Sequence, residues 1–112
     1  MPLPEQSTLL RVFIGEADEA DGRPLYEAIV TRARKFNMAG ATVLRGPLGF
    51  GRSSLLHTAK ILRLSQDLPI ILEIVETTER IEQILPRLDA MVEGGLITLE
   101  KVRVILYRAA KK

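Results

Sequence analysis

A basic, glycine-rich stretch in the middle of the chain has the residue types best suited to binding a ligand. Between Ala28 and Gln66 there is no Asp or Glu, and the stretch includes the closely spaced glycines Gly46, Gly49 and Gly51. The cations of the stretch are Arg32, Arg34, Lys35, Arg45, Arg52, Lys60 and Arg63. Glycine lets backbone amides converge on an anion, and guanidinium groups pair with its oxygens. The stretch predicts a site for a phosphate-bearing ligand; a solvated basic loop is the alternative.

The segment from Gly46 to Ser53 has the spacing of a P-loop without its chemistry. Arg52 stands where the P-loop has its lysine, and no well-defined helix is predicted after it. A chain of 112 residues also lacks room for the parallel sheet of P-loop enzymes. We therefore interpret the glycines as allowing a flexible loop to approach a ligand or partner.

No catalytic constellation emerges elsewhere. The chain has no cysteine, and its one histidine, His57, has no nucleophile nearby in sequence, so a polar loop residue is favoured over a general base. The acidic run from Glu16 to Asp21 lacks the spacing of an EF-hand and is interpreted as a solvated turn. We expect no enzymatic activity, no metal and no required cofactor.

Hydrophobic periodicity predicts four strands and two helices, with a long connecting segment, the excursion 46–66, between the second and third strands. The strands are expected at 8–15, 41–45, 68–76 and 98–107. One helix should begin at Pro24 and stop before Gly40, and the other should run from a cap at Thr77 or Thr78 to Gly94. Pro86 predicts a kink in the second helix, or two short helices. The order β-α-β, excursion 46–66, β-α-β indicates a ferredoxin-like α+β fold, an antiparallel sheet with two helices on one face.

The sheet face without helices is predicted to be too apolar for water. We assign to it Leu9, Arg11 and Phe13; Ala41, Val43 and Arg45; Ile71, Glu73 and Val75; and Arg103, Ile105 and Tyr107. Burial against another copy would require its charges to pair, with Glu73 bound to Arg11 or Arg103. The pattern predicts a homo-oligomer; the alternative is an exposed apolar face on a monomer.

Composition points to one globular domain over residues 1–112. The hydrophobic fraction is 46% and the charged fraction 27%, as in ordinary globular proteins. The chain shows no secretory signal and no apolar stretch of bilayer length, so we expect a cytoplasmic protein. Its net charge of +2 is too small to indicate nucleic-acid binding.

The sequence resembles the bacterial and archaeal PII-like family catalogued as domain of unknown function 190. The resemblance extends from Leu9 to Tyr107, and its most distinctive block is GATVLRGPLGFGRSS, residues 40–54. It implies a ferredoxin-like trimer that binds adenine nucleotides, AMP, ADP or ATP, in clefts between subunits. It also implies that loop 46–66 contacts a protein target such as a transporter or channel. The glycine-rich turn of PII proteins before the last strand is only partly matched, by Gly94 and Gly95.

The leading hypothesis is a non-enzymatic regulatory protein with an anionic ligand at this cleft. Phosphate contacts are assigned to Arg45, Arg52, Ser53, Ser54 and His57, close backbone approach to Gly46, Gly49, Gly51, Gly94 and Gly95, and base stacking to Phe50. An RNA-binding module is one alternative, disfavoured by the lack of aromatic residues in strand 68–76. A small acylphosphatase-like hydrolase is another, although its anion loop would have to follow the first strand.

Overall fold

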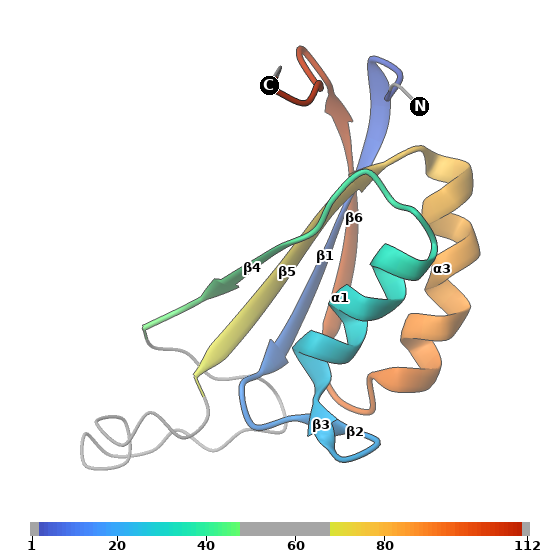
Figure 1. Cartoon of the computed structure of the whole chain (residues 1–112). Coiled ribbons are helices and arrows are strands. Elements are labelled where there is room, and N and C mark those ends of the chain that lie inside the picture. The colour runs from blue at the N-terminus through green and yellow to red at the C-terminus, as the bar shows by residue number, and fades with distance from the viewer. Residues whose placement is uncertain (1–2, 48–67, 111–112) are drawn as a thin grey trace.

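The computed structural model describes residues 3–47 and 68–110, which form a four-stranded antiparallel sheet with two helices on one side (Figure 1). The strands are β1 (Gln6–Gly15), β4 (Thr42–Arg45), β5 (Pro69–Glu76) and β6 (Leu96–Arg103), in the spatial order β4-β5-β1-β6. The helices are α1 (Leu25–Lys35) and α3 (Thr78–Met91). The predicted ferredoxin-like α+β fold is confirmed.

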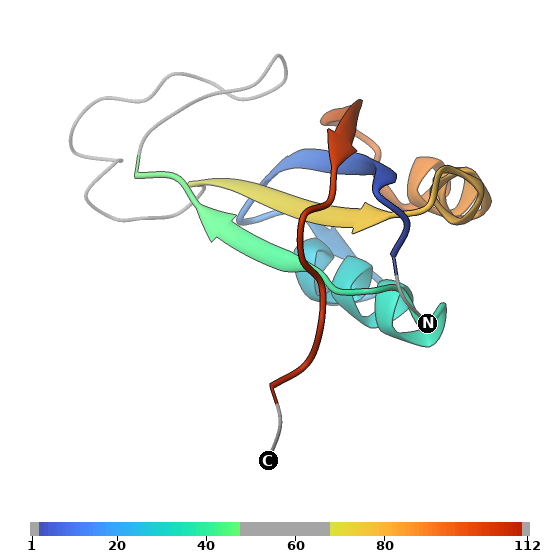
Figure 2. The same cartoon turned by 90° about the horizontal axis from the view of Figure 1, so that it is seen from above.

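Alternating residues of the two central strands build the core. Leu10, Val12 and Ile14 of β1 lie beside Ile74, Leu72 and Ile70 of β5 in the antiparallel register and are buried with them. Each helix adds a buried stripe at helical spacing. These stripes are Leu25, Ile29 and Ala33 of α1 and Ile81, Ile84 and Leu88 of α3. The opposite face of the sheet carries no helix (Figure 2), and we call it the open face.

The first helix begins and ends differently from the prediction. Pro24 is the N-cap and belongs to a short ribbon of β2 (Glu19–Ala20) and β3 (Arg23–Pro24) that leads into α1. The helix ends at Lys35 because Asn37 adopts a left-handed conformation, with φ of 55°. Asn37 N donates to Arg34 O and Met38 N donates to Ala33 O, which is a Schellman motif. Asn37, not Gly40, is therefore the stop signal.

The second helix is a single element. The side chain of Thr77 accepts a hydrogen bond from Arg80 N (3.3 Å), which confirms the predicted N-cap. The helix continues through Pro86 to Met91, so the alternative of two short helices is wrong. Pro86 is tolerated on an exposed position, away from the buried stripe.

The predicted faces of the two edge strands are wrong. Val43 and Arg45 pair with Leu72 and Ile70 and so lie on the helix side, whereas Leu44 lies on the open face. All four residues of β4 are exposed, so its sequence has no alternation of apolar and polar residues from which the buried face could be predicted. A register shift of one residue exchanges the two faces of a strand.

The last strand ends earlier than predicted. It stops at Arg103 because its partner β1 begins at Gln6, which pairs with Arg103, so no ladder continues to 107. Val102 lies on the open face and Arg103 on the helix side. Ile105 and Tyr107 therefore do not belong to the sheet.

Candidate functional site

The candidate site is the end of the sheet where excursion 46–66 leaves β4 and the chain returns to β5. Gly46 N donates to Pro69 O and Glu16 N donates to Leu68 O, each at 2.8 Å. These bonds hold the ends of β4, β5 and β1 side by side. We call Glu16, Arg45, Gly46, Leu68 and Pro69 the loop base.

An ion pair spans the loop base. The Arg45 guanidinium contacts Glu16 Oε2, and the two side chains are 56% and 21% exposed. The other carboxylate oxygen, Glu16 Oε1, is buried and accepts no hydrogen bond from any residue that the structure describes. A guanidinium has five N–H donors, so Arg45 can bind an anion while one of its nitrogens remains on Glu16.

The turn after β1 fixes the backbone next to Glu16. Asp18 Oδ2 accepts a hydrogen bond from Gly15 N at 3.0 Å, and Asp18 N donates to Gly15 O at 3.2 Å. Together with the bond from Glu16 N to Leu68 O, these contacts anchor the segment on both sides. The acidic turn thus supplies Glu16 to the site, a role that the sequence analysis missed.

Gly46 is a glycine for reasons of packing. A Cβ at this position would lie 2.9 Å from Pro69 Cγ, closer than carbon atoms approach without displacement. Its amide is already engaged by Pro69 O, so Gly46 allows the close approach of two strands and its N–H is not free for an anion. Within the loop base, Arg45 is the group that can attract a phosphate.

Gly94 and Gly95 lie at the same end of the sheet but at its other edge. Leu96, which follows them, pairs with Phe13 near the end of β1. A Cβ on Gly95 would lie 2.6 Å from Phe13 O, so the neighbouring strand already explains this glycine. Three strand spacings of about 4.8 Å separate the two edges, about 14 Å in all. One copy of the chain therefore does not bring Gly94 and Gly95 to Arg45 and Gly46.

The remaining predicted site residues, Gly49, Phe50, Gly51, Arg52, Ser53, Ser54 and His57, lie outside the described residues.

The open face carries a charged cluster among apolar side chains. Arg11 Nε donates to Glu73 Oε2 at 2.8 Å, as predicted, and Arg11 Nη1 donates to Glu100 Oε1 at 3.1 Å. The hydrogen bond to Glu73 raises the pKa of Arg11 above its ordinary value, and the charges of both carboxylates act in the same direction. The alternative partner, Arg103, pairs instead with Glu5 at 2.5 Å. The cluster holds its charges in ion pairs and presents no reactive group.

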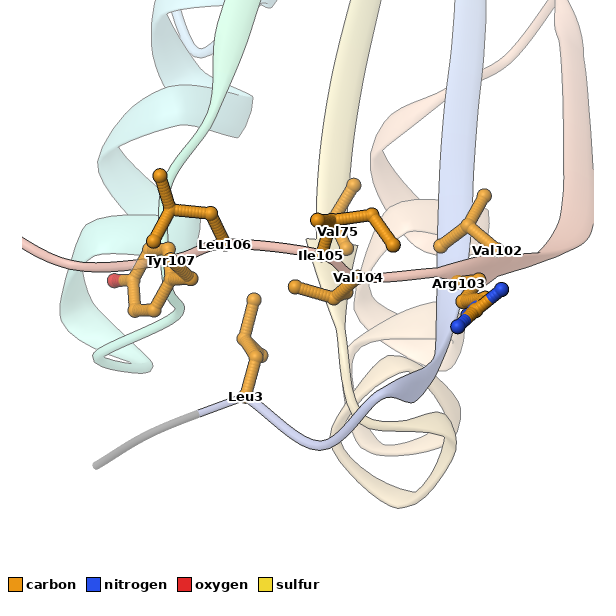
Figure 3. Close-up of a pocket in the computed structure, with 8 residues that line it drawn as sticks. All are labelled: Leu3, Val75, Val102, Arg103, Val104, Ile105, Leu106 and Tyr107. Carbon is orange, nitrogen blue, oxygen red and sulfur yellow. The ribbon is translucent and has the colours of Figure 1, made fainter.

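A cavity of about 500 Å³ lies at the opposite end of the sheet. It forms where the chain after β6 crosses toward β4 (Figure 2), held by hydrogen bonds from Val104 N to Glu5 O and from Tyr107 Oη to Ala39 O, both 2.7 Å. Its lining residues are Leu3, Val75, Val102, Arg103, Val104, Ile105, Leu106 and Tyr107 (Figure 3). Only Arg103 is charged, and Glu5 neutralises it. The cavity is thus an apolar surface feature rather than a polar ligand site.

The described residues offer neither a membrane span nor a metal cluster. Within 3–47 and 68–110, no helix combines the length and the apolar character needed to cross a bilayer. In the same two ranges, no three His, Asp or Glu side chains are grouped as metal ligands.

Comparison with known sequences decides the family. The profile of domain of unknown function 190 (DUF190), described as "Uncharacterized ACR", matches residues 7–104. This chain belongs to the DUF190 family. The match confirms that the segments around residues 40–54 were correctly assigned to domain of unknown function 190.

Curated relatives of this DUF190 protein are similar over nearly their full length. A UPF0166 protein of Aquifex aeolicus (strain VF5) is 36% identical over 97 residues, covering 87% of this chain and 91% of the relative. A UPF0166 protein of Methanocaldococcus jannaschii is 31% identical over 100 residues, with coverage of 88% and 92%. These names state no activity, so the function must be argued from the site.

Proposed function

We propose that this DUF190 protein is a non-enzymatic regulatory protein of the PII-like kind. Its ligand is a small anion, an adenine nucleotide such as AMP, ADP or ATP, bound in a cleft between the subunits of a homotrimer. The observation that carries the proposal is the placement of Arg45 and Gly46 at one edge of the sheet and of Gly94 and Gly95 at the other edge of the same end.

This placement favours a site between copies. The two pairs are too far apart in one chain to contact one phosphate group, since two strands, β5 and β1, lie between β4 and β6. If the β4 edge of one copy lies against the β6 edge of the next, both pairs border one cleft. A head-to-tail contact of this kind closes into a ring when its rotation permits, and a trimer is the simplest such ring after the dimer.

The charge distribution supports an anionic ligand. Arg45 is more than half exposed and is held by Glu16 at the edge from which the basic stretch continues. A positioned guanidinium forms strong, charge-assisted hydrogen bonds to phosphate oxygens. Regulation would then follow from contacts of loop 46–66 with a protein target, a transporter or channel.

The open face argues against the RNA-binding alternative. RNA-recognition modules of this strand order stack bases on aromatic side chains of the sheet. Here β5 presents Ile71, Glu73 and Val75 on the open face, and the neighbouring Arg11 is neutralised by Glu73 and Glu100.

The test combines oligomeric mass with nucleotide binding. We expect light scattering to give three times the 12.5 kDa chain mass, and at least one of AMP, ADP and ATP to raise the melting temperature, because a ligand that binds the native state stabilises it. Arg45→Ala and Arg52→Ala should each weaken that nucleotide at least several-fold. Arg34→Ala, at an exposed position of α1, is the control and should leave its affinity unchanged. A monomer that binds none of the three nucleotides would refute the proposal.

A further inference from the structure

We infer that Glu16 recognises a sugar hydroxyl of the ligand, so that the pair of Arg45 and Glu16 selects a ribose phosphate over a bare phosphate. This inference rests on the proposed function and specifies the chemistry of the same site. The sequence predicts a solvated turn at Glu16, whereas the structure places its carboxylate against Arg45.

The unpaired oxygen of Glu16 is the first observation. Oε2 is engaged by Arg45, while Oε1 is buried and receives no hydrogen bond from the described part of the chain. Buried polar atoms in proteins nearly always have a partner, and an unpaired carboxylate oxygen is costly to bury. A group that donates a hydrogen bond at this position would remove that cost.

The rigidity of the turn is the second observation. Glu16 N is bonded to Leu68 O, and Gly15 N is bonded to Asp18 Oδ2. The backbone that carries Glu16 is therefore anchored to β5 on one side and to its own turn on the other. A carboxylate held in this way is organised before the ligand arrives, which favours selectivity.

The two groups together define the ligand. Arg45 attracts an anionic group, whereas the adjoining carboxylate repels one and accepts a donor. A phosphate ion supplies the anion but meets the repulsion of Glu16. A ribose phosphate supplies both groups, since its phosphate can reach Arg45 while a hydroxyl donates to Glu16 Oε1. Acidic side chains are a recurrent partner of ribose hydroxyls in nucleotide sites.

The test compares ribonucleotides with their deoxy counterparts by calorimetry. AMP, ADP and ATP are each measured against the 2′-deoxy and 3′-deoxy forms, with inorganic phosphate as the bare anion. We expect the wild-type protein to bind one of the two deoxy forms at least tenfold more weakly than the ribonucleotide. Glu16→Ala should remove this discrimination, and Glu16→Gln, which keeps an acceptor oxygen, should retain part of it. Glu19→Ala, an exposed acidic residue in β2, is the matched control and should discriminate as the wild type does.

The outcomes separate this inference from the proposed function. If the wild type binds ribonucleotide and both deoxy forms equally, the inference is wrong and the proposed function stands. If Glu16→Ala binds all forms more tightly and still discriminates, Glu16 is only a competing anion and the inference is again wrong. If the wild type binds no nucleotide, both fall. The comparison of ligands on the wild type decides the question even if Glu16→Ala fails to fold.

Discussion

The residue types at the end of the sheet are explained by the atoms that lie within a few ångströms of them. Gly46 faces Pro69, and Gly95 faces the carbonyl oxygen of Phe13. The sequence predicts a close approach of the backbone to the ligand at both glycines, and the structure shows that the approach is to neighbouring strands. The side chains of Arg45 and Arg11, in contrast, are held in position by ion pairs with Glu16 and Glu73.

Gly95→Ala is expected to destabilise the fold by about 1–3 kcal/mol, because the new methyl group would lie 2.6 Å from a backbone oxygen that cannot easily move. Urea unfolding followed by circular dichroism measures the change. Gly40→Ala is the matched control, since nothing lies within 4 Å of its Cβ position. Equal stability of the two variants would show that the contact at Gly95 is relieved without cost.

Secondary-structure elements end here for reasons that differ from one element to the next. The helix α1 ends because Asn37 adopts the left-handed conformation, and β6 ends because β1 offers no further partner. Only the first of these is local and can be identified from residue type. The helix α3 continues through Pro86 because its buried stripe, Ile81, Ile84 and Leu88, lies on both sides of the proline and packs on the sheet.

Pro86→Ala is expected to stabilise the protein by about 1–3 kcal/mol. Proline lacks the amide hydrogen that would bond to the carbonyl four residues earlier and clashes with that carbonyl, and the exposed ring makes little compensating contact. Thermal and urea unfolding would report the gain. Gln83→Ala, also exposed on α3, serves as the control and should change stability by less than about 0.5 kcal/mol. A loss of stability in Pro86→Ala would mean that the proline is required.

The whole molecule has one covered and one uncovered sheet face. The open face holds Leu9, Phe13, Leu44, Ile71, Val75 and Leu96 around the cluster of Arg11, Glu73 and Glu100. Leu44 and Leu96 are about half exposed, and Ile105 and Leu106 beyond β6 are more exposed still. Apolar area of this extent on one side of a small protein is typical of an interface. This arrangement supports the proposed assembly of identical copies.

Leu44→Asp is expected to weaken the proposed homo-oligomer at least tenfold, because it places a charge on the open face. Gln83→Asp is the control, because it adds the same charge at an exposed position of α3. Leu44 is 45% exposed on the open face, whereas Gln83 lies in a helix on the other side of the sheet. Sedimentation over a concentration series measures both dissociation constants. Equal weakening by the two substitutions would show that the open face is not the interface.

Local patterns are sufficient to predict the fold. The period of two in 8–15 and 68–76 and the helical period of the two amphipathic segments specify which side of each of these elements is buried. The sequence also limited the partner of Glu73 to Arg11 or Arg103, because these charges interrupt apolar strands, and the structure shows the pair with Arg11. For the candidate site, residue type singled out Arg45 and Gly46, and the resemblance to PII-like proteins pointed to Gly94 and Gly95.

Other features depend on contacts between residues that are distant in the sequence. The face of β4 depended on its register with β5, because a fully exposed strand of four residues has no pattern of burial. Glu16 became the partner of Arg45 only because β1 and β4 lie on either side of β5 and end at the same level. Such a contact joins residues far apart in sequence through a third strand, and local patterns carry no information about it. The separation of Arg45 from Gly94 was likewise set by strand order, and it is the reason for proposing that the ligand lies between copies.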